Sequence, residues 1–559
     1  MAANILTPLM LWRTFSFDKK PRLDVISTKQ TASAVIQKIY IDGRTTKTGT
    51  VKIYGVSACP KDVDGDLPTI IVFSGGKEEY DERIASFIAK NGYHGFVFNL
   101  YGKREDCDRY TLYPDDISYA NFEQSKDCLQ KVKRDVKHTC WYEWSSAARY
   151  VFNTVKSMDG IGKIGAVGIK EFATSVWHLA ANEKDLSAMA TLFGFGWETN
   201  RGLYKFGDQL EPKFSDETLM FVAGIEPESY AMHVKCPTLV LTSTNNSVWD
   251  VDRAYDTVSK ISDDYFRAVN YSVNFTDSLS STAPQNLKLF FDAILKGDGE
   301  EFKDYSTKCD LRAECKFGKL YFDLTVPSTC VEKVELYVAE EIIDPSKRCW
   351  KRIECSSNEN GKFQFEYLPY ADSMQVVYFA KIKYKNGFIF STPVASKKFS
   401  SSEISVSHKS CVIYSGRDEN AESVFSPLVE NQLVVKPDEE VVEKSGPMGI
   451  KGMSTLSGVQ TFRINAKKYR PKDDAILMFD VYVKEACTVT VKLIQDGGDY
   501  STTYQTVTSI GGGRVWYNLK FEKSKFKTTE GMILKTYDKI TRIVFQTEKA
   551  GLINNVLWV

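Results

Sequence analysis

The chain has 559 residues, and at roughly 100–200 residues per domain this length predicts three or four domains. Lys+Arg and Asp+Glu both total 72, so no net field attracts nucleic acid or an anionic membrane surface, and we exclude both as partners. No window reaches the roughly 18 apolar residues of a membrane span, and residues 1–12 lack the basic start of a signal peptide. We therefore expect a cytoplasmic protein.

The 12 cysteines are scattered, without a C-x-x-C pair or a histidine at zinc-ligand spacing, so we predict no metal site and no cofactor. Five of them fall within about 50 residues of one another. They are Cys309, Cys315, Cys330, Cys349 and Cys355. Reduced thiols are the expected state in a cytosolic protein, and one or two disulfides in this segment are the alternative.

The first 100 residues predict a sheet. Residues 10–60 alternate polar and apolar side chains, as in 35–41 and 49–56, and this pattern predicts two or three antiparallel strands. Residues 69–73 form a continuous apolar run, as is typical of buried parallel strands, and residues 95–100 read as the next buried strand, with an amphipathic helix predicted between them. Strands that alternate with helices indicate βαβ units and a mostly parallel sheet.

A strand, a sharp turn and a helix are predicted around Gly168. This is the setting of the nucleophile elbow, in which the sequence G-x-S-x-G holds a serine on a strained turn above the sheet. Lys170 occupies the serine position and Phe172 the final glycine position. We expect the bulky Phe172 to crowd the contact between strand and helix, and the elbow to have relaxed from its strained geometry.

Residues 15–297 resemble the α/β-hydrolase superfamily, most closely its dienelactone-hydrolase and acetyl-xylan-esterase-type members. The resemblance is carried by Ser74, Gly75 and Gly76 after a buried strand, the aromatic stretch 141–144, the Gly168 turn, and residues 236–242, similar to the late strand that delivers the catalytic acid. It implies a doubly wound, mostly parallel α/β sheet, with a serine, an acid and a histidine in that chain order.

The triad that the resemblance implies is not matched. Lys170 replaces the serine, Asn246 falls at the position of the aspartate, and Thr276 lies in the segment that should carry the histidine. No histidine occurs between His233 and His408. A serine needs an oriented base to become nucleophilic, so three departures predict an inactive triad. Misaligned catalytic residues are the alternative.

Lys170 as a nucleophile of its own is a further alternative, but the opposite charge of Glu171 would keep it protonated, and a solvated turn is favoured. Gly75, Gly76 and Lys77, together with Glu171, form an oxyanion-like turn whose backbone N–H groups would meet an anion; an ordinary strand-to-helix turn is the alternative.

Aromatic residues near the predicted site are candidates for a sugar-stacking pocket, and core packing is their alternative role. They are Tyr110, Tyr113, Trp141, Trp144 and Trp197.

Beyond residue 299 the pattern becomes all-β. We divide the chain into an α/β-hydrolase-like domain (1–300), a β-sandwich that resembles immunoglobulin or fibronectin-III modules (301–405), and a β-rich module (406–559). The last resembles the jelly-roll carbohydrate-binding modules of polysaccharide-degrading enzymes. Candidate sugar-stacking residues there are Tyr500, Tyr504 and Trp516, with sandwich packing as the alternative role.

Together these features predict a catalytically degenerate hydrolase-fold protein that binds a carbohydrate or a carbohydrate ester. An active carbohydrate esterase with non-standard catalytic residues is one alternative. A structural or assembly protein built on a hydrolase scaffold is the other. The oligomeric state stays open at this point.

Overall fold

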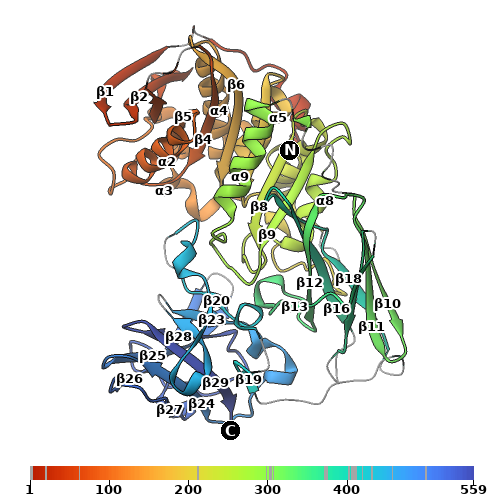
Figure 1. The fold of residues 1–559 in the computed structure, drawn as a ribbon. Helices are drawn as coiled ribbons and strands as arrows, with labels where there is room; N and C mark the ends of the chain where they lie inside the picture. Colours follow the sequence, from red (N-terminus) through yellow and green to blue (C-terminus); the bar gives the residue numbers. More distant parts are fainter. Residues whose placement is uncertain are drawn as a thin grey trace.

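The computed structural model describes residues 4–18, 20, 22–61, 63, 65–210, 213–297, 299–300, 302, 305, 308–359, 361–369, 375–400, 403, 412–417, 420–429, 432–455, 458–497 and 500–559. An α/β domain is followed by two all-β sandwiches, which lie below it in Figure 1. Within these residues no helix is both long and apolar enough to cross a membrane.

The α/β domain is built on a mixed sheet. Its strands are β1 (Leu23–Gln30), β2 (Ala34–Thr45), β3 (Thr50–Pro60), β4 (Leu67–Ser74), β5 (His94–Asn99), β6 (Ile161–Ile169), β7 (Leu186–Leu192), β8 (Thr238–Ser243) and β9 (Arg267–Ser272). They lie in the order β1-β2-β3-β5-β4-β6-β7-β8-β9. The first three and β5 pair antiparallel, and the pairs from β5–β4 to β8–β9 are parallel. This is the α/β-hydrolase fold, as predicted.

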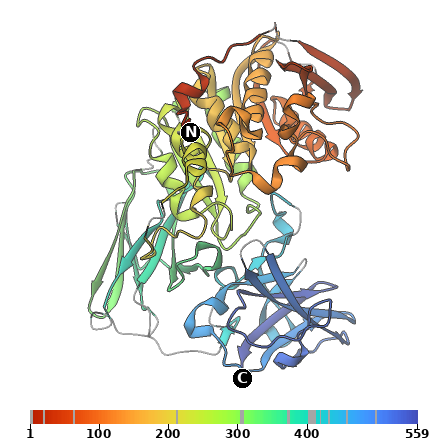
Figure 2. The ribbon, with the colours of Figure 1, turned by 180° about the vertical axis from the view of Figure 1, so that it is seen from behind.

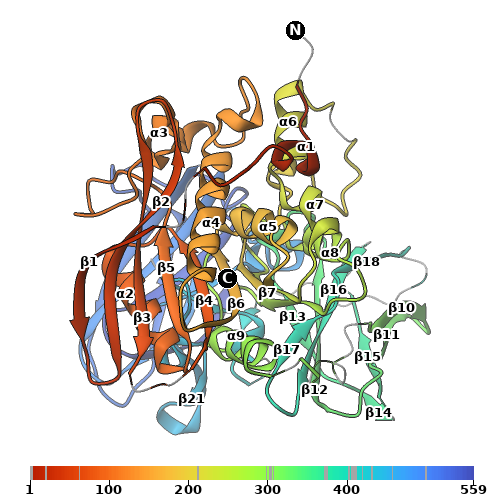
Figure 3. The same ribbon diagram turned by 90° about the horizontal axis from the view of Figure 1, so that it is seen from above.

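Helices cover both faces of the sheet. They are α1 (Pro8–Trp12), α2 (Glu78–Lys90), α3 (Phe122–Ser125), α4 (Cys140–Lys156), α5 (Phe172–Asn182), α6 (Asp216–Gly224), α7 (Pro227–Tyr230), α8 (Ala254–Val258) and α9 (Ala283–Phe291). Figure 3 shows α4 and α5 on one side of the sheet and α9 on the other. Because both faces are covered, the central strands are buried almost throughout, which is why they read as continuous apolar runs.

The second domain is a sandwich of two antiparallel sheets. One contains β10 (Asp310–Lys316), β11 (Lys319–Thr325), β14 (Ser357–Glu359) and β15 (Lys362–Tyr367). The other contains β12 (Val331–Glu340), β13 (Lys351–Ile353), β16 (Gln375–Tyr384), β17 (Ile389–Ser391) and β18 (Ala395–Lys398). Strand β17 pairs with β9 at Ser391 and Val269, so the hydrolase sheet runs on into the second domain. The two domains share one hydrophobic core.

The third domain has a separate core between two sheets. One sheet holds β19 (Val412–Tyr414), β21 (Glu443–Ser445), β22 (Lys451–Thr455), β24 (Leu477–Val483), β27 (Tyr517–Phe521) and β29 (Gly551–Trp558). The other holds β20 (Ser426–Pro427), β23 (Val459–Thr461), β25 (Cys487–Gly497), β26 (Tyr500–Ile510) and β28 (Arg542–Thr547). Among the described residues the five clustered cysteines form no disulfide with one another.

A strap, formed by residues 429 and 432–435, runs from the third domain to the hydrolase body. Leu279 and the strap exchange two backbone hydrogen bonds, from Leu279 N to Leu433 O (2.8 Å) and from Val435 N to Leu279 O (2.9 Å). The Ser278 hydroxyl donates to Gln432 O at 2.6 Å. In Figures 1 and 2 this part of the chain is the light-blue segment that climbs from the third domain toward the α/β domain.

Candidate functional site

A cavity of about 1110 Å³ lies at the carboxyl ends of the parallel strands. Its lining comes from the turns after β4, β5, β6 and β9, from α2, and from the strap. The lining residues are Ser74, Gly75, Gly76, Lys77, Glu79, Tyr80, Arg83, Tyr101, Arg104, Ile169, Lys170, Glu171, Asp277, Ser278, Val429, Gln432 and Leu433. Open α/β sheets bind ligands at this end, next to the point where the strand order reverses, here between β4 and β6.

Lys170 stands at the turn between β6 and α5, with a φ of 54°. A non-glycine residue with positive φ is strained, so the expected relaxation of the elbow is wrong on this point. The reason is that the close contact between strand and helix is made by Gly168, where an added Cβ would lie 2.5 Å from Ala173 Cα. Phe172 points elsewhere, against Tyr101 and Trp144 at ring distances of 4.7 and 5.2 Å.

The side chain of Glu171 is held by Tyr101, whose hydroxyl donates to it at 2.9 Å. Burial, and then the nearby Glu171 carboxylate, raise the pKa of Tyr101 well above its ordinary value. Among the described residues no hydrogen bond or ion pair engages the Lys170 ammonium, and the hydrogen bond to the Glu171 carboxylate comes from Tyr101. Lys170 is half-buried and lines the cavity.

The turn after β4 also lines the cavity and contains Gly75, Gly76 and Lys77. Arg104 donates to Gly75 O at 2.7 Å, and Lys77 forms an ion pair with Asp106 at 3.4 Å. The three residues and Glu171 all line the cavity, and the Gly76 N–H lies 3.4 Å from the Ser74 hydroxyl oxygen; an oxyanion role for this turn stays a prediction.

Below this turn the Ser74 hydroxyl donates to Asp81 at 2.5 Å. Asp81 lies on α2 and is buried, and burial raises the pKa of its carboxyl group to about 7. The hydrogen bond from Ser74 and the charge of Arg104 oppose that rise.

Two of the three predicted triad positions are in contact. Asn246, just after β8, donates to Thr276 O at 3.2 Å and to the Asp277 carboxylate at 2.9 Å. Its side-chain oxygen accepts the backbone N–H groups of Val248 (2.8 Å) and Trp249 (3.0 Å). The amide is therefore fully occupied in bracing two loops. Asp277, which lines the cavity, is the acidic residue that sequence reasoning missed.

Histidine is missing from the lining of the cavity, as far as the chain is described. His178 is buried inside α5, bonded to Ile225 O at 2.8 Å, and burial lowers its pKa to about 3. His94 starts β5, and burial lowers its pKa to about 4. His138 pairs with Asp135 at 2.7 Å. His408 lies outside the described residues.

The five aromatic residues predicted to form the pocket do not line this cavity. Trp141 and Trp144 are buried in the core, where their indole N–H groups donate to backbone carbonyls at 2.8 and 2.9 Å. Tyr113 donates to Leu100 O at 2.8 Å, and the Tyr110 carbonyl accepts from Tyr40. For this set the alternative of structural packing is the better description.

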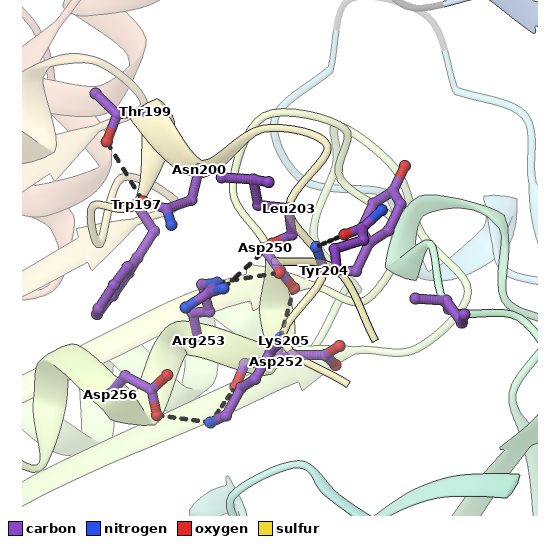
Figure 4. Close-up of polar contacts among 12 residues, drawn as sticks. Trp197, Thr199, Asn200, Leu203, Tyr204, Lys205, Asp250, Asp252, Arg253 and Asp256 are labelled. Carbon is purple, nitrogen blue, oxygen red and sulfur yellow. Dashed lines mark hydrogen bonds and ion pairs between the residues drawn. The ribbon is translucent and has the colours of Figure 1, made fainter. Parts of the chain in front are cut away.

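Trp197, the fifth of that set, lies in the loop after β7. Its indole N–H donates to Thr257 at 2.9 Å, and the Arg253 guanidinium lies 4.9 Å from the centre of its ring. Figure 4 shows Trp197 and Arg253 side by side. Lys205 fixes the same loop by an ion pair with Asp256 at 2.6 Å (Figure 4). Trp197 is thus engaged with residues of α8 and the turn before it, and does not line the cavity.

In the third domain the candidate aromatics do not form one platform. Tyr504 is half-buried on β26, in the five-stranded sheet. Trp516 precedes β27 of the other sheet and lies over Gly446 and Gly452, with its indole N–H on Pro447 O at 3.2 Å. The Tyr500 side chain lies outside the described residues.

Comparison with known proteins gives a likeness in fold. No protein-family model and no curated protein matches the chain. An acetyl xylan esterase from Paenibacillus sp. R4 shares 11% identity over 52% of this chain and 92% of its own, with a TM-score of 0.40. Acetyl xylan esterase 1 from Thermoanaerobacterium sp. shares 12% identity over 46% of this chain and 83% of its own, with a TM-score of 0.33. A dienelactone hydrolase-like promiscuous phosphotriesterase from metagenomic libraries shares 16% identity over 46% of this chain and 87% of its own, with a TM-score of 0.30. At such identities no residue role is transferred.

Proposed function

We propose that the chain is a non-hydrolysing member of the α/β-hydrolase fold that binds a carbohydrate or carbohydrate ester in the cavity at Lys170. The observation that carries the proposal is the lysine at the elbow, above an intact cavity whose described lining contains no histidine. Acyl transfer by a serine requires a base within hydrogen-bond reach and a third group that orients that base.

The environment of Asn246 supports the loss of the triad. Its amide nitrogen donates to a carbonyl and to a carboxylate, which is a role for a donor. An aspartate at this position would place its oxygen beside Thr276 O and its charge beside Asp277. The loops are therefore arranged around an amide, and restoring an acid would meet like-charge repulsion.

The composition of the cavity supports a polyhydroxylated ligand. Lysine and arginine side chains are donors only, and the carboxylates of Glu79, Glu171 and Asp277 are acceptors only. A sugar hydroxyl both donates and accepts, so neighbouring hydroxyls match a lining that contains both donors and acceptors. Tyr101 and Asn246 each occupy part of one carboxylate and leave further acceptor positions. Tyr80 adds an aromatic face in the same wall.

Binding is tested by isothermal titration of the full chain with xylo-oligosaccharides and their acetylated forms. We expect the parent to release or absorb heat on binding. Lys170→Met should bind with an affinity about tenfold or more lower, since a charge-assisted hydrogen bond contributes about 1.5–3 kcal/mol. Lys90→Met, at the exposed end of α2, is the matched control and should bind like the parent. Absence of binding by the parent would refute the proposal.

Catalysis is tested with p-nitrophenyl acetate and acetylated xylo-oligosaccharides. We expect no hydrolysis above the Lys170→Ala variant, and none from Lys170→Ser, because no base is in place to deprotonate the new hydroxyl. Loss of triad members typically costs about 10⁴-fold or more in rate. A robust rate that disappears on changing another serine would select the active-esterase alternative instead.

A further inference from the structure

A second, apolar groove of about 180 Å³ lies directly beside the polar cavity. Helix α2 forms one wall and α9 the other, the sheet forms the floor, and the strap closes one end. Phe87 at the groove is 53% exposed, an unusual position for a large aromatic side chain unless something covers it.

The two spaces share a wall. Tyr80, Ile169 and Leu433 line both the polar cavity and the apolar groove. Ile169 is the residue before Lys170, and Leu433 belongs to the strap, which is fixed by its backbone hydrogen bonds to Leu279. A single ligand can therefore place a polar part next to Lys170 and an apolar part past Ile169 in the groove.

The dimensions of the groove set the size of that apolar part. A purely apolar cavity of about 150 Å³ in another protein accepts a benzene ring, so 180 Å³ accommodates about six carbon atoms. Among the described residues that line the groove, Lys288 is the one with a charged side chain. Most of the groove's lining is aliphatic or aromatic, so the groove offers mainly contacts to hydrocarbon.

We infer that the ligand is a carbohydrate that carries an alkyl or acyl chain of about six carbons, with the sugar in the cavity at Lys170 and the chain in the groove between α2 and α9. This inference rests on the proposed function and narrows the class of ligand. The chain would cover Phe87 and remove apolar surface from water, which strengthens binding in proportion to the buried area.

The test is titration of the full chain with a series of alkyl β-xylobiosides, from methyl to decyl, below their micelle concentrations. We expect the affinity to rise about fourfold per methylene, the value for a buried CH₂ of about 0.8 kcal/mol, and to level off near six carbons. Leu287→Trp, which fills the groove from α9, should abolish the rise and leave methyl xylobioside unaffected. Gln285→Trp, exposed on the same helix, is the control.

Equal affinity for methyl and hexyl xylobioside overturns the inference and leaves the proposed function standing. Equal affinity for hexyl xylobioside and a hexyl tetraethylene glycol ether refutes the sugar and so the proposed function, although the groove would still bind a chain. If Leu287→Trp fails to fold, Phe87→Ala, a change at an exposed position, should lower the gain from the hexyl chain several-fold; an unchanged gain counts against the inference.

Discussion

Arg348 of the second domain and Asp252 of the hydrolase domain form a bidentate ion pair in which both side chains are completely buried. The two hydrogen bonds measure 2.5 and 2.8 Å, and the guanidinium also donates to Ile342 O and Ile343 O. The pair lies where residues 344–350 enter between the loops after β8 and β9. Asn245 and Asn274 bind the same segment through its backbone, at Arg348 O and Trp350.

Removing one partner of this pair should destabilise the protein strongly. Arg348→Met leaves Asp252 buried without a counter-charge, and we expect the free energy of unfolding to fall by about 3–5 kcal/mol. Chemical denaturation measures the change. The double variant Arg348→Met/Asp252→Leu should recover most of the loss, because no buried charge remains. A single variant as stable as the parent would contradict the burial of the pair.

Unfolding should occur in two transitions. The hydrolase and second domains share one core, in which Phe379 of β16 packs on Tyr271 of β9 at 4.9 Å, whereas the third domain has its own core. We expect scanning calorimetry to show one transition lowered by Phe379→Ala and another lowered by Phe479→Ala. Each buried Phe→Ala change should cost about 3–5 kcal/mol. A single transition that responds to both variants would show that the third core is coupled to the first.

The positive φ of Lys170 predicts an unusual response to glycine. Lys170→Gly should raise the free energy of unfolding or leave it unchanged. Glycine adopts φ = 54° without strain, whereas a residue with a Cβ loses about 1 kcal/mol there. Lys170→Val should lower it, since a β-branched residue is least compatible with this conformation. Denaturant titration compares them with Lys90→Gly in α2, which should lose about 1 kcal/mol. A loss at position 170 similar to that at position 90 would contradict the strained turn.

Asn246 should not tolerate a carboxylate. Asn246→Asp places a charge where the amide now donates to Asp277 at 2.9 Å, so we expect a loss of about 1–3 kcal/mol in the free energy of unfolding at neutral pH. The double variant Asn246→Asp/Asp277→Asn restores one donor and one acceptor across the contact and should recover part of the loss. A neutral single variant would show that the loops rearrange freely.

Asp81 predicts a dependence of stability on pH. Its pKa is raised to about 7 in the folded protein, so between about pH 4 and pH 7 the folded state holds a proton that the unfolded state has released. Stability from this group is complete below pH 4 and declines as the pH rises to 7, by at most about 1.4 kcal/mol per pH unit. Asp81→Asn should lack this decline, so its advantage over the parent should grow with pH. A constant difference would refute the raised pKa.

Much of the hydrolase fold follows from local sequence. The apolar run 69–73 and the glycine at 168 predict buried parallel strands and a close turn, because burial on both faces and a tight strand–helix contact leave few other choices. The position of Lys170 at the turn was predicted for the same reason. The positive φ of Lys170 was not predicted. Phe172 was expected to crowd the turn, but the helix residue that lies close to Gly168 is Ala173.

The cavity itself was harder to predict, because its walls come from segments that are far apart in the chain. Gln432 and Leu433 reach it only through the strap, and no periodicity or motif marks them. Asp277 was missed because only one residue, Thr276, was aligned with the histidine position, and Asp277 is the residue after it. Trp141 and Trp144 were predicted to line the pocket because tryptophan often stacks on sugars, but both indole groups are buried in the core and donate to backbone carbonyls. The division of the chain at residues 300 and 405 stays a prediction, since the first two domains share one core.

The pairing of β17 with β9 also bears on how the protein behaves toward copies of itself. A strand at the border of a sheet exposes backbone groups that invite another chain to add a strand, and self-association by that route is a recurrent hazard. Here β9 is already paired within the chain, and the sheet ends instead at β13, which has three residues. At the opposite border β1 is interrupted by an irregularity between Val25 and Ser27. Both borders are thus poor templates for the addition of a strand from a second copy.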